Sequence, residues 1–179
     1  MSHFLMIRVA LLCSVAVVFA YGCTIPPRPG TPVPPAAEMV APVDPRAVVY
    51  GSSIEDVLRN SEVGDKIRAM FGPDWSGGQL APPGASAYSG NAGPPRLVRI
   101  GEVNYVAVTG CVPGGCDSRR VLLLIREGGS EILARLDEGG FSHYYAYGNI
   151  SRDAAQLIAD SGWRALQRAS SNPFPSTTS

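Results

Sequence analysis

The stretch from Tyr105 to Arg126 constrains the fold more than any other part of the chain, because it has the pattern of a β-hairpin. Strand-forming residues precede a short loop, and the apolar run Val121–Ile125 follows it. The loop is Cys111-Val112-Pro113-Gly114-Gly115-Cys116, in which the proline fixes φ and the glycines accept positive φ. In an oxidising compartment a Cys111–Cys116 bond would remove about 2 kcal/mol of unfolded-state freedom. The pattern predicts a stiff projection at the end of a hairpin.

The beginning of the chain has the layout of a secretory signal, assigned to residues 1–22. One charge, Arg8, precedes an apolar run from Val9 to Ala20, which is too short to cross a bilayer as a helix. Met6 would serve as initiator as well as Met1, so the start of translation stays open. Export implies an oxidising compartment for the hairpin cysteines.

The residues Ala20-Tyr21-Gly22-Cys23 resemble the lipobox of bacterial lipoproteins. This resemblance implies cleavage before Cys23 and attachment of lipid to it, the alternative being an ordinary signal with Cys23 as a stray thiol. The cysteine count supports the first interpretation, because Cys13 leaves with the signal, Cys23 takes lipid, and Cys111 and Cys116 pair. Thr24 follows Cys23, and similarity to the proteobacterial sorting pattern implies the outer membrane.

The mature chain divides into a linker, one domain and a tail. Residues 23–47 are rich in proline and are predicted to form a lipid-attached extended spacer, with a Pro-rich recognition ligand as the alternative. Residues 48–170 are enough for one domain with a single core, and 171–179 are predicted to be disordered. The 15 basic and 15 acidic residues leave no basic field to hold nucleic acid.

The periodicity of the domain predicts an α+β fold, with an antiparallel β-meander of about five strands and flanking helices. Ser52 and Glu55 have capping-box spacing, and the helical pattern after them breaks near Gly64 and ends by Gly72-Pro73. Residues 77–95 are rich in small residues and predict a long surface loop. The expected strands are 96–100, 105–110, 119–126, 132–136 and 141–147. A closing helix is expected over residues 151–166, and Gly162 could split it.

We find no arrangement of side chains that suggests catalysis, and we predict that the protein is not an enzyme. The mature chain has one histidine, His143, in an expected strand, where a surface or satisfied role is the common one. Asp137 and Glu138 lie beside a turn and are expected to be solvated. Cys111 and Cys116 lack two further ligands at zinc-site spacing, so no metal or other cofactor is expected.

From Ile100 to Glu138 the sequence resembles the core of the Ivy family, bacterial inhibitors of vertebrate lysozyme. The shared features are a strand with a Gly-Glu turn and Tyr105, the pattern Cys111-x-Pro113-x-x-Cys116, an apolar strand, and a closing Asp-Glu pair. The resemblance is weaker over residues 53–75 and fades after Tyr147. It implies an α+β fold and a periplasmic role in binding a protein, with the loop as the contact.

The loop departs from the family pattern at three positions. Val112, Gly114 and Gly115 stand where the family has a lysine, a histidine that meets the catalytic carboxylates of lysozyme, and an acid. Arg119 and Arg120 beside the loop are poorly suited to a cationic lysozyme. Our hypothesis is that a slim tip enters a hydrolase cleft and that the N–H groups of Gly114 and Gly115 face a carboxylate. A non-inhibitory envelope lipoprotein with another protein partner is the alternative, and a homodimer is left open.

Overall fold

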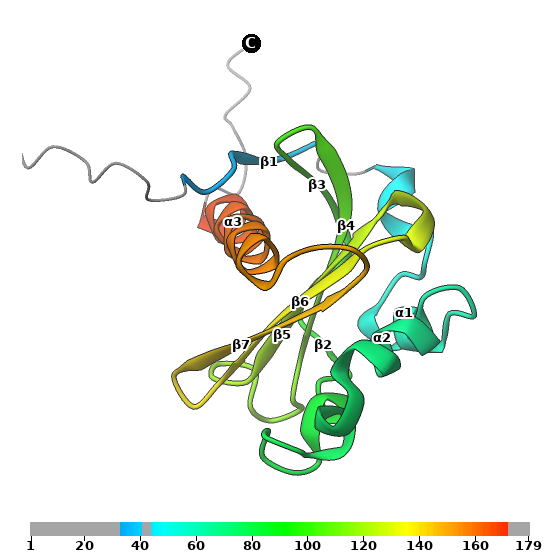
Figure 1. The fold of residues 1–179 in the computed structure, drawn as a ribbon, viewed down its shortest axis with the longest axis vertical. Coiled ribbons are helices and arrows are strands. Elements are labelled where there is room, and N and C mark those ends of the chain that lie inside the picture. Colours follow the sequence, from blue (N-terminus) through cyan, green and yellow to red (C-terminus); the bar gives the residue numbers. More distant parts are fainter. Residues whose placement is uncertain (1–32, 41–43, 172–179) are drawn as a thin grey trace, which may run out of the picture. The chain divides into compact units, whose positions relative to one another are not determined.

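A computed structural model describes residues 33–40 and 44–171, and those from Pro34 onward belong to one compact unit (Figure 1). Short 3₁₀ segments, η1 to η4, connect several of its elements. The strands and helices are β1 (Ala37–Met39), α1 (Ile54–Arg59), α2 (Gly64–Phe71), β2 (Gly90–Asn91), β3 (Arg96–Ile100), β4 (Val103–Cys111), β5 (Arg120–Arg126), β6 (Ile132–Glu138), β7 (Phe141–Tyr147) and α3 (Arg152–Ser171).

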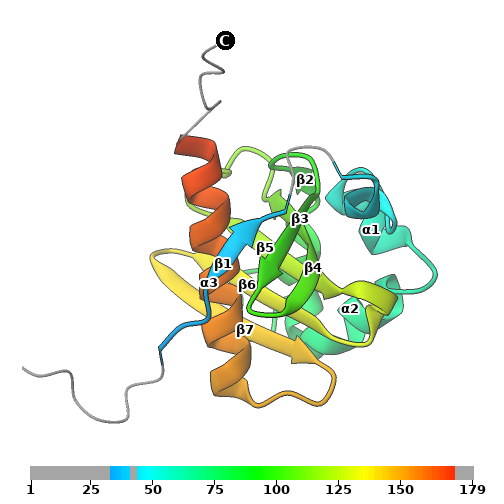
Figure 2. The ribbon, with the colours of Figure 1, turned by 90° about the horizontal axis from the view of Figure 1, so that it is seen from above.

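All pairings in the sheet are antiparallel, which confirms the predicted α+β fold. The strands follow the order β1-β3-β4-β5-β6-β7, and β2 pairs with β4 (Figure 2). The five long strands, β3 to β7, form the meander expected from the sequence. The short strands β1 and β2 add to it at positions that the sequence did not indicate.

The two faces of the sheet are covered by different helices, as Figure 1 shows. Helices α1 and α2 pack on one face with Val106 and Val108 of β4, whereas α3 packs on the other face with Tyr105 and Ala107. Because successive strand residues point to opposite faces, β5 meets a helical layer on each side. This explains why Val121–Ile125 is a continuous apolar run.

The first helical region consists of two short helices, one of the two alternatives, with a single interrupted helix, that the break near Gly64 left open. The capping residue is Ser53, one residue later than expected, and its side chain accepts a hydrogen bond from the Asp56 N–H at 3.1 Å. The Asp56 carboxylate in turn accepts bonds from the hydroxyl and N–H of Ser52, which lower its pKa. Helix α2 ends at Phe71, where Gly72 takes a φ of 54°.

The predicted linker boundary at residue 47 is wrong. Strand β1 pairs with β3, with Glu38 opposite Arg99 and ion-paired with it. Ala47 is buried in the core. Proline-rich and edge-strand segments are both extended, so composition alone did not separate them. Residues 23–32 and 41–43 of the linker and 172–179 of the tail lie outside the described residues, and Ser171 is the last residue of α3.

The stretch 77–95, expected to be a surface loop, contributes side chains to the core. Leu80, Ala85 and Tyr88 are buried, and the stretch ends in β2, which pairs with β4. Tyr88 is the only aromatic residue in a stretch of mostly small residues, which was the available signal for its burial.

Helix α3 is continuous, and Gly162 does not split it. Gly162 faces the sheet, where an added Cβ would lie 3.0 Å from Leu124 and 3.3 Å from Ile100. A glycine at this position therefore lets helix α3 pack closely against the sheet.

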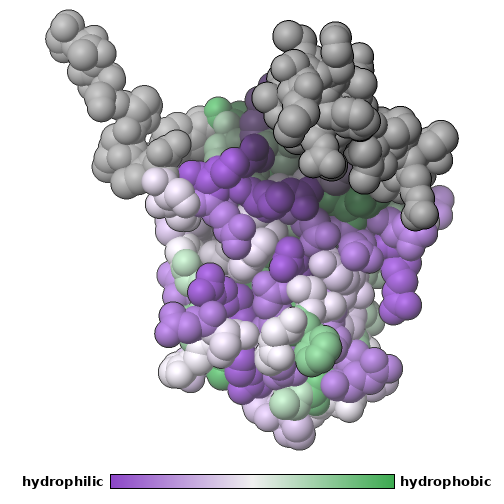
Figure 3. Space-filling view, turned by 90° about the vertical axis from the view of Figure 1, so that its left-hand side faces the viewer, coloured by the Kyte–Doolittle hydropathy of each residue, from purple (hydrophilic) through white to green (hydrophobic). Residues whose placement is uncertain are grey.

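None of the described helices combines the length and apolar character needed to cross a membrane. Figure 3 shows mainly hydrophilic residues on the side of the domain where α3 lies.

Candidate functional site: the disulfide-closed loop

The candidate site is the loop that connects β4 to β5. The two strands pair from Tyr105 opposite Arg126 to Cys111 opposite Arg120, so the loop starts where the ladder ends. A disulfide joins Cys111 to Cys116 across a Cα–Cα distance of 4.9 Å. Cys111 is buried and Cys116 is exposed, so the bond ties the outer part of the loop to the core of the sheet.

Two successive turns shape the loop. The Gly115 N–H donates to the Val112 carbonyl at 2.8 Å, and Gly114 has a φ of 80°, which together with Pro113 gives a type II turn. The Gly115 carbonyl then accepts from the N–H groups of Ser118 at 3.1 Å and Arg119 at 2.9 Å. The conformation is therefore set by hydrogen bonds inside the loop as well as by the disulfide.

The tip of the loop consists of Pro113 and Gly114, which are exposed, whereas Val112 packs partly against the core. One part of our hypothesis is wrong: the Gly115 N–H points into the turn and is occupied by the Val112 carbonyl. The N–H of Gly114 makes no backbone hydrogen bond within the described part of the chain. Only one of the two donors expected to face a carboxylate is therefore available.

Arg119 does not add an uncompensated charge beside the loop. Its guanidinium lies 3.0 Å from the Glu138 carboxylate and 5.7 Å from the ring centre of Tyr88. The other Glu138 oxygen accepts from the Ala81 N–H at 3.1 Å. The expectation that Glu138 is solvated is wrong, because its side chain is 15% exposed. The stretch 77–95 brings Tyr88 and Ala81 to this ion pair. Because these residues are far apart in the sequence, the sequence did not predict that they meet.

The Arg119–Glu138 contact is a charge contact without the alignment of a hydrogen bond. The Tyr88 hydroxyl and the Arg119 Nε lie buried beside it, with no hydrogen-bond partner among the described residues. Burial raises the pKa of Tyr88, and the nearby Arg119 opposes that change. This polar cluster lies under the loop and links it to the 77–95 stretch.

No family model, curated protein or solved structure matches this chain.

The carboxylate of Asp137, the neighbour of Glu138, is also bound by side chains of the protein rather than solvated. It accepts from Arg135 Nε at 2.9 Å and from the Ser142 hydroxyl at 2.7 Å. Arg135 also reaches Asp160 of α3 at 2.9 Å, and Asp160 accepts from Tyr144 at 2.7 Å. Burial and the hydrogen bond to Asp160 raise the pKa of Tyr144. These contacts attach α3 to the sheet.

The remaining candidate residues do not join the loop. His143 lies in β7 opposite Leu136 and is half-buried. Among the described residues no group of three or more histidine, cysteine or acidic side chains could hold a metal ion. Cys23 and the signal segment 1–22 lie outside the described residues.

Proposed function

We propose that the protein binds a lysozyme or another cell-wall hydrolase through the loop Cys111–Cys116. The observation that carries this proposal is the form of the loop, whose tip of Pro113 and Gly114 is exposed while its base is fixed by a disulfide. Such a tip is preorganised, so little conformational entropy is lost when a cleft closes around it. The resemblance to the Ivy family supports the choice of partner.

Binding through this tip differs from binding through a histidine. The Gly114 N–H is the one donor at the tip that could reach a carboxylate, and such a bond contributes about 1.5–3 kcal/mol. Glycine adds no side chain to fill a cleft. We therefore expect weak or no inhibition of hen-type lysozyme, and a better fit to a hydrolase with a narrower cleft.

A matched pair of variants tests the loop. Gly114 and Gly101 both have positive φ, 80° and 59°, and an added Cβ at either position meets nothing within 4 Å. Gly101 lies in the β3–β4 turn, so valine strains an open turn in both variants. We expect Gly114→Val to weaken hydrolase binding at least tenfold and Gly101→Val to leave it unchanged.

The affinity of each variant is measured against surface-immobilised enzymes, namely lysozymes of different types and bacterial peptidoglycan hydrolases. Activity assays on the same enzymes follow. Equal binding by Gly114→Val and the unsubstituted protein would place the contact elsewhere. If no hydrolase binds, the alternative function is favoured: an envelope lipoprotein that uses the same scaffold for assembly or immunity.

We further propose that the protein is anchored by lipid at Cys23 on the periplasmic side, in the outer membrane. The residues Ala20-Tyr21-Gly22-Cys23 motivate this. The unsubstituted protein should label with palmitate and fractionate with membranes, and Cys23→Ser should lose both properties completely. A Cys23→Ser protein that still carries lipid would contradict the anchor.

A further inference from the structure

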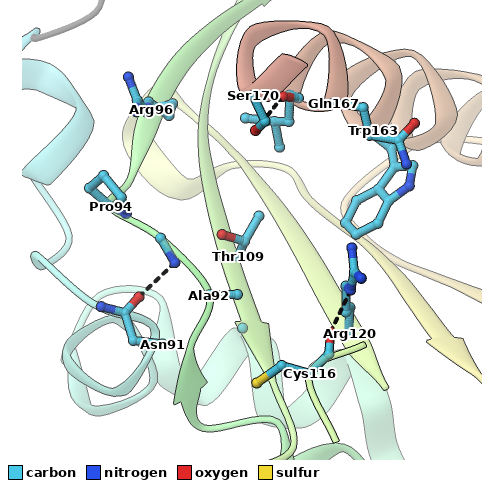
Figure 4. A pocket seen from close by; sticks show the side chains of 13 residues that line it. Asn91, Ala92, Pro94, Arg96, Thr109, Cys116, Arg120, Trp163, Gln167 and Ser170 are labelled. Atoms are coloured by element: carbon cyan, nitrogen blue, oxygen red, sulfur yellow. Dashed lines mark hydrogen bonds between the residues drawn. The ribbon is translucent and has the colours of Figure 1, made fainter. Parts of the chain in front are cut away.

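A cavity lies beside the loop, on the face of the sheet that carries α3. Its walls come from residues 91–96, from the end of β4, from the C-terminal half of α3 and from the loop itself (Figure 4). Its volume is about 480 Å³, within the range of small-molecule sites. Thr109 and Gly110 of β4 form part of the lining.

Arg120 is a charged side chain in this cavity whose orientation is fixed by hydrogen bonds. Its Nε donates to the Cys116 carbonyl at 2.6 Å and its Nη2 to the Asp117 carbonyl at 3.1 Å. In Figure 4 its side chain lies between Cys116 and Trp163. Within the described part of the chain, no carboxylate lies at ion-pair distance from Arg120, unlike Arg119 and Arg135. The guanidinium is thus held in a fixed orientation, and Asp137, which lies opposite Arg120 on β6, is ion-paired with Arg135 instead.

The rest of the lining suits an organic anion. None of the lining residues is acidic. Asn91 and Gln167 supply carboxamides, and Trp163 supplies an aromatic surface. Arg135 lies 5.2 Å from the centre of the Trp163 ring and helps to hold that ring in place.

We propose that this cavity binds a small N-acylated carboxylate, with the carboxylate at Arg120, the acylamide at Asn91 or Gln167, and the apolar part against Trp163. A guanidinium that is oriented by two carbonyls presents its remaining N–H groups to a carboxylate with little loss of freedom. The C-terminus of α3 carries about half a negative charge, which falls off within the last turn and does not offset a full guanidinium charge. This inference does not depend on the function proposed for the loop.

Two natural sources share this chemistry, a peptide C-terminus and an N-acetylated sugar acid. Each has an uncharged counterpart, so matched pairs separate charge from shape. We would titrate the purified full chain calorimetrically with N-acetyl-dialanine and its C-terminal amide, and with N-acetylmuramic acid and its carboxamide. We expect at least one acid to bind at least tenfold more tightly than its uncharged counterpart, and the pair that shows the difference identifies the source.

Variants then place the binding. Arg120→Gln should reduce the affinity of the bound acid at least tenfold. Arg126→Gln removes the same charge from the other end of β5, outside the cavity, and should leave the affinity unchanged. The proposal is overturned if neither acid is preferred to its counterpart, a comparison that needs no substitution, or if a correctly folded Arg120→Gln binds the acid as tightly as the unsubstituted chain.

Discussion

Replacing Gly110 with alanine is expected to destabilise the domain by about 3 kcal/mol, at the upper end of typical overpacking costs. Gly110 lies in β4 directly before the loop disulfide. A Cβ at this position would lie 2.5 Å from the Tyr88 carbonyl oxygen and 3.1 Å from side-chain atoms of Ile54 and Val121. Backbone oxygen cannot rotate away as a side chain can, so the strand and the 77–95 stretch would have to separate.

The matched control is Gly115→Ala, five residues further along. An added Cβ there has its nearest neighbours at 3.6 Å, so we expect a change within about 0.5 kcal/mol. Urea unfolding followed by tryptophan fluorescence measures both variants. Equal stabilities would mean that the 77–95 stretch does not lie against β4 as described. The contact of Tyr88 with Arg119 under the loop would then be contradicted as well.

Much of the fold was predictable because the signals were local. Paired strands in a meander are close in sequence, and glycine-containing turns such as Gly101-Glu102 mark their limits. The disulfide was predictable for the same reason, since both cysteines flank one turn. The type II turn at Pro113-Gly114 also follows from sequence, and it would have shown that the Gly115 N–H is occupied.

What could not be predicted depends on pairing between distant segments. Strand β1 is recognisable only through its partner β3, because an extended proline-rich stretch looks the same with or without a partner. Arg119 and Glu138 lie 19 residues apart in sequence and meet because the sheet register and Tyr88 bring them together. Gly162 resembles a helix breaker until the packing of Leu124 against it is known.

The same long-range contacts make the protein sensitive to alkali, which is the second large effect that we expect. Tyr105 is 2% exposed and donates to Glu131 at 2.6 Å, and Tyr145 donates to Asp74 at 2.9 Å. Burial first, and the carboxylate partner second, raise the pKa of both phenols well above the ordinary value. Burial also raises the pKa of Tyr50, Tyr88 and Tyr144.

The direction in which stability changes with pH follows from proton linkage. Below about pH 10, the ordinary pKa of tyrosine, the phenols are neutral in both states and their stabilising contribution is complete. Above that pH the unfolded chain loses phenolic protons that the folded chain retains, so stability falls by about 1.4 kcal/mol per pH unit for each such tyrosine. We expect unfolding free energies measured in urea at several pH values to be level up to about pH 9 and to drop steeply beyond pH 10.

Removing single hydroxyls assigns the effect to particular residues. Tyr105→Phe and Tyr145→Phe should each reduce the slope between pH 10 and 11 by about 1 kcal/mol per pH unit, because the unfolded phenol is only half ionised at pH 10. The two rings lie in the clusters on opposite faces of the sheet, so the reductions should add in the double variant. Neutral-pH stability should also fall, because Glu131 and Asp74 each lose a hydrogen-bond donor. A slope that is unchanged in the double variant would show that these phenols ionise equally in the folded and unfolded states, and therefore that they are not held as described.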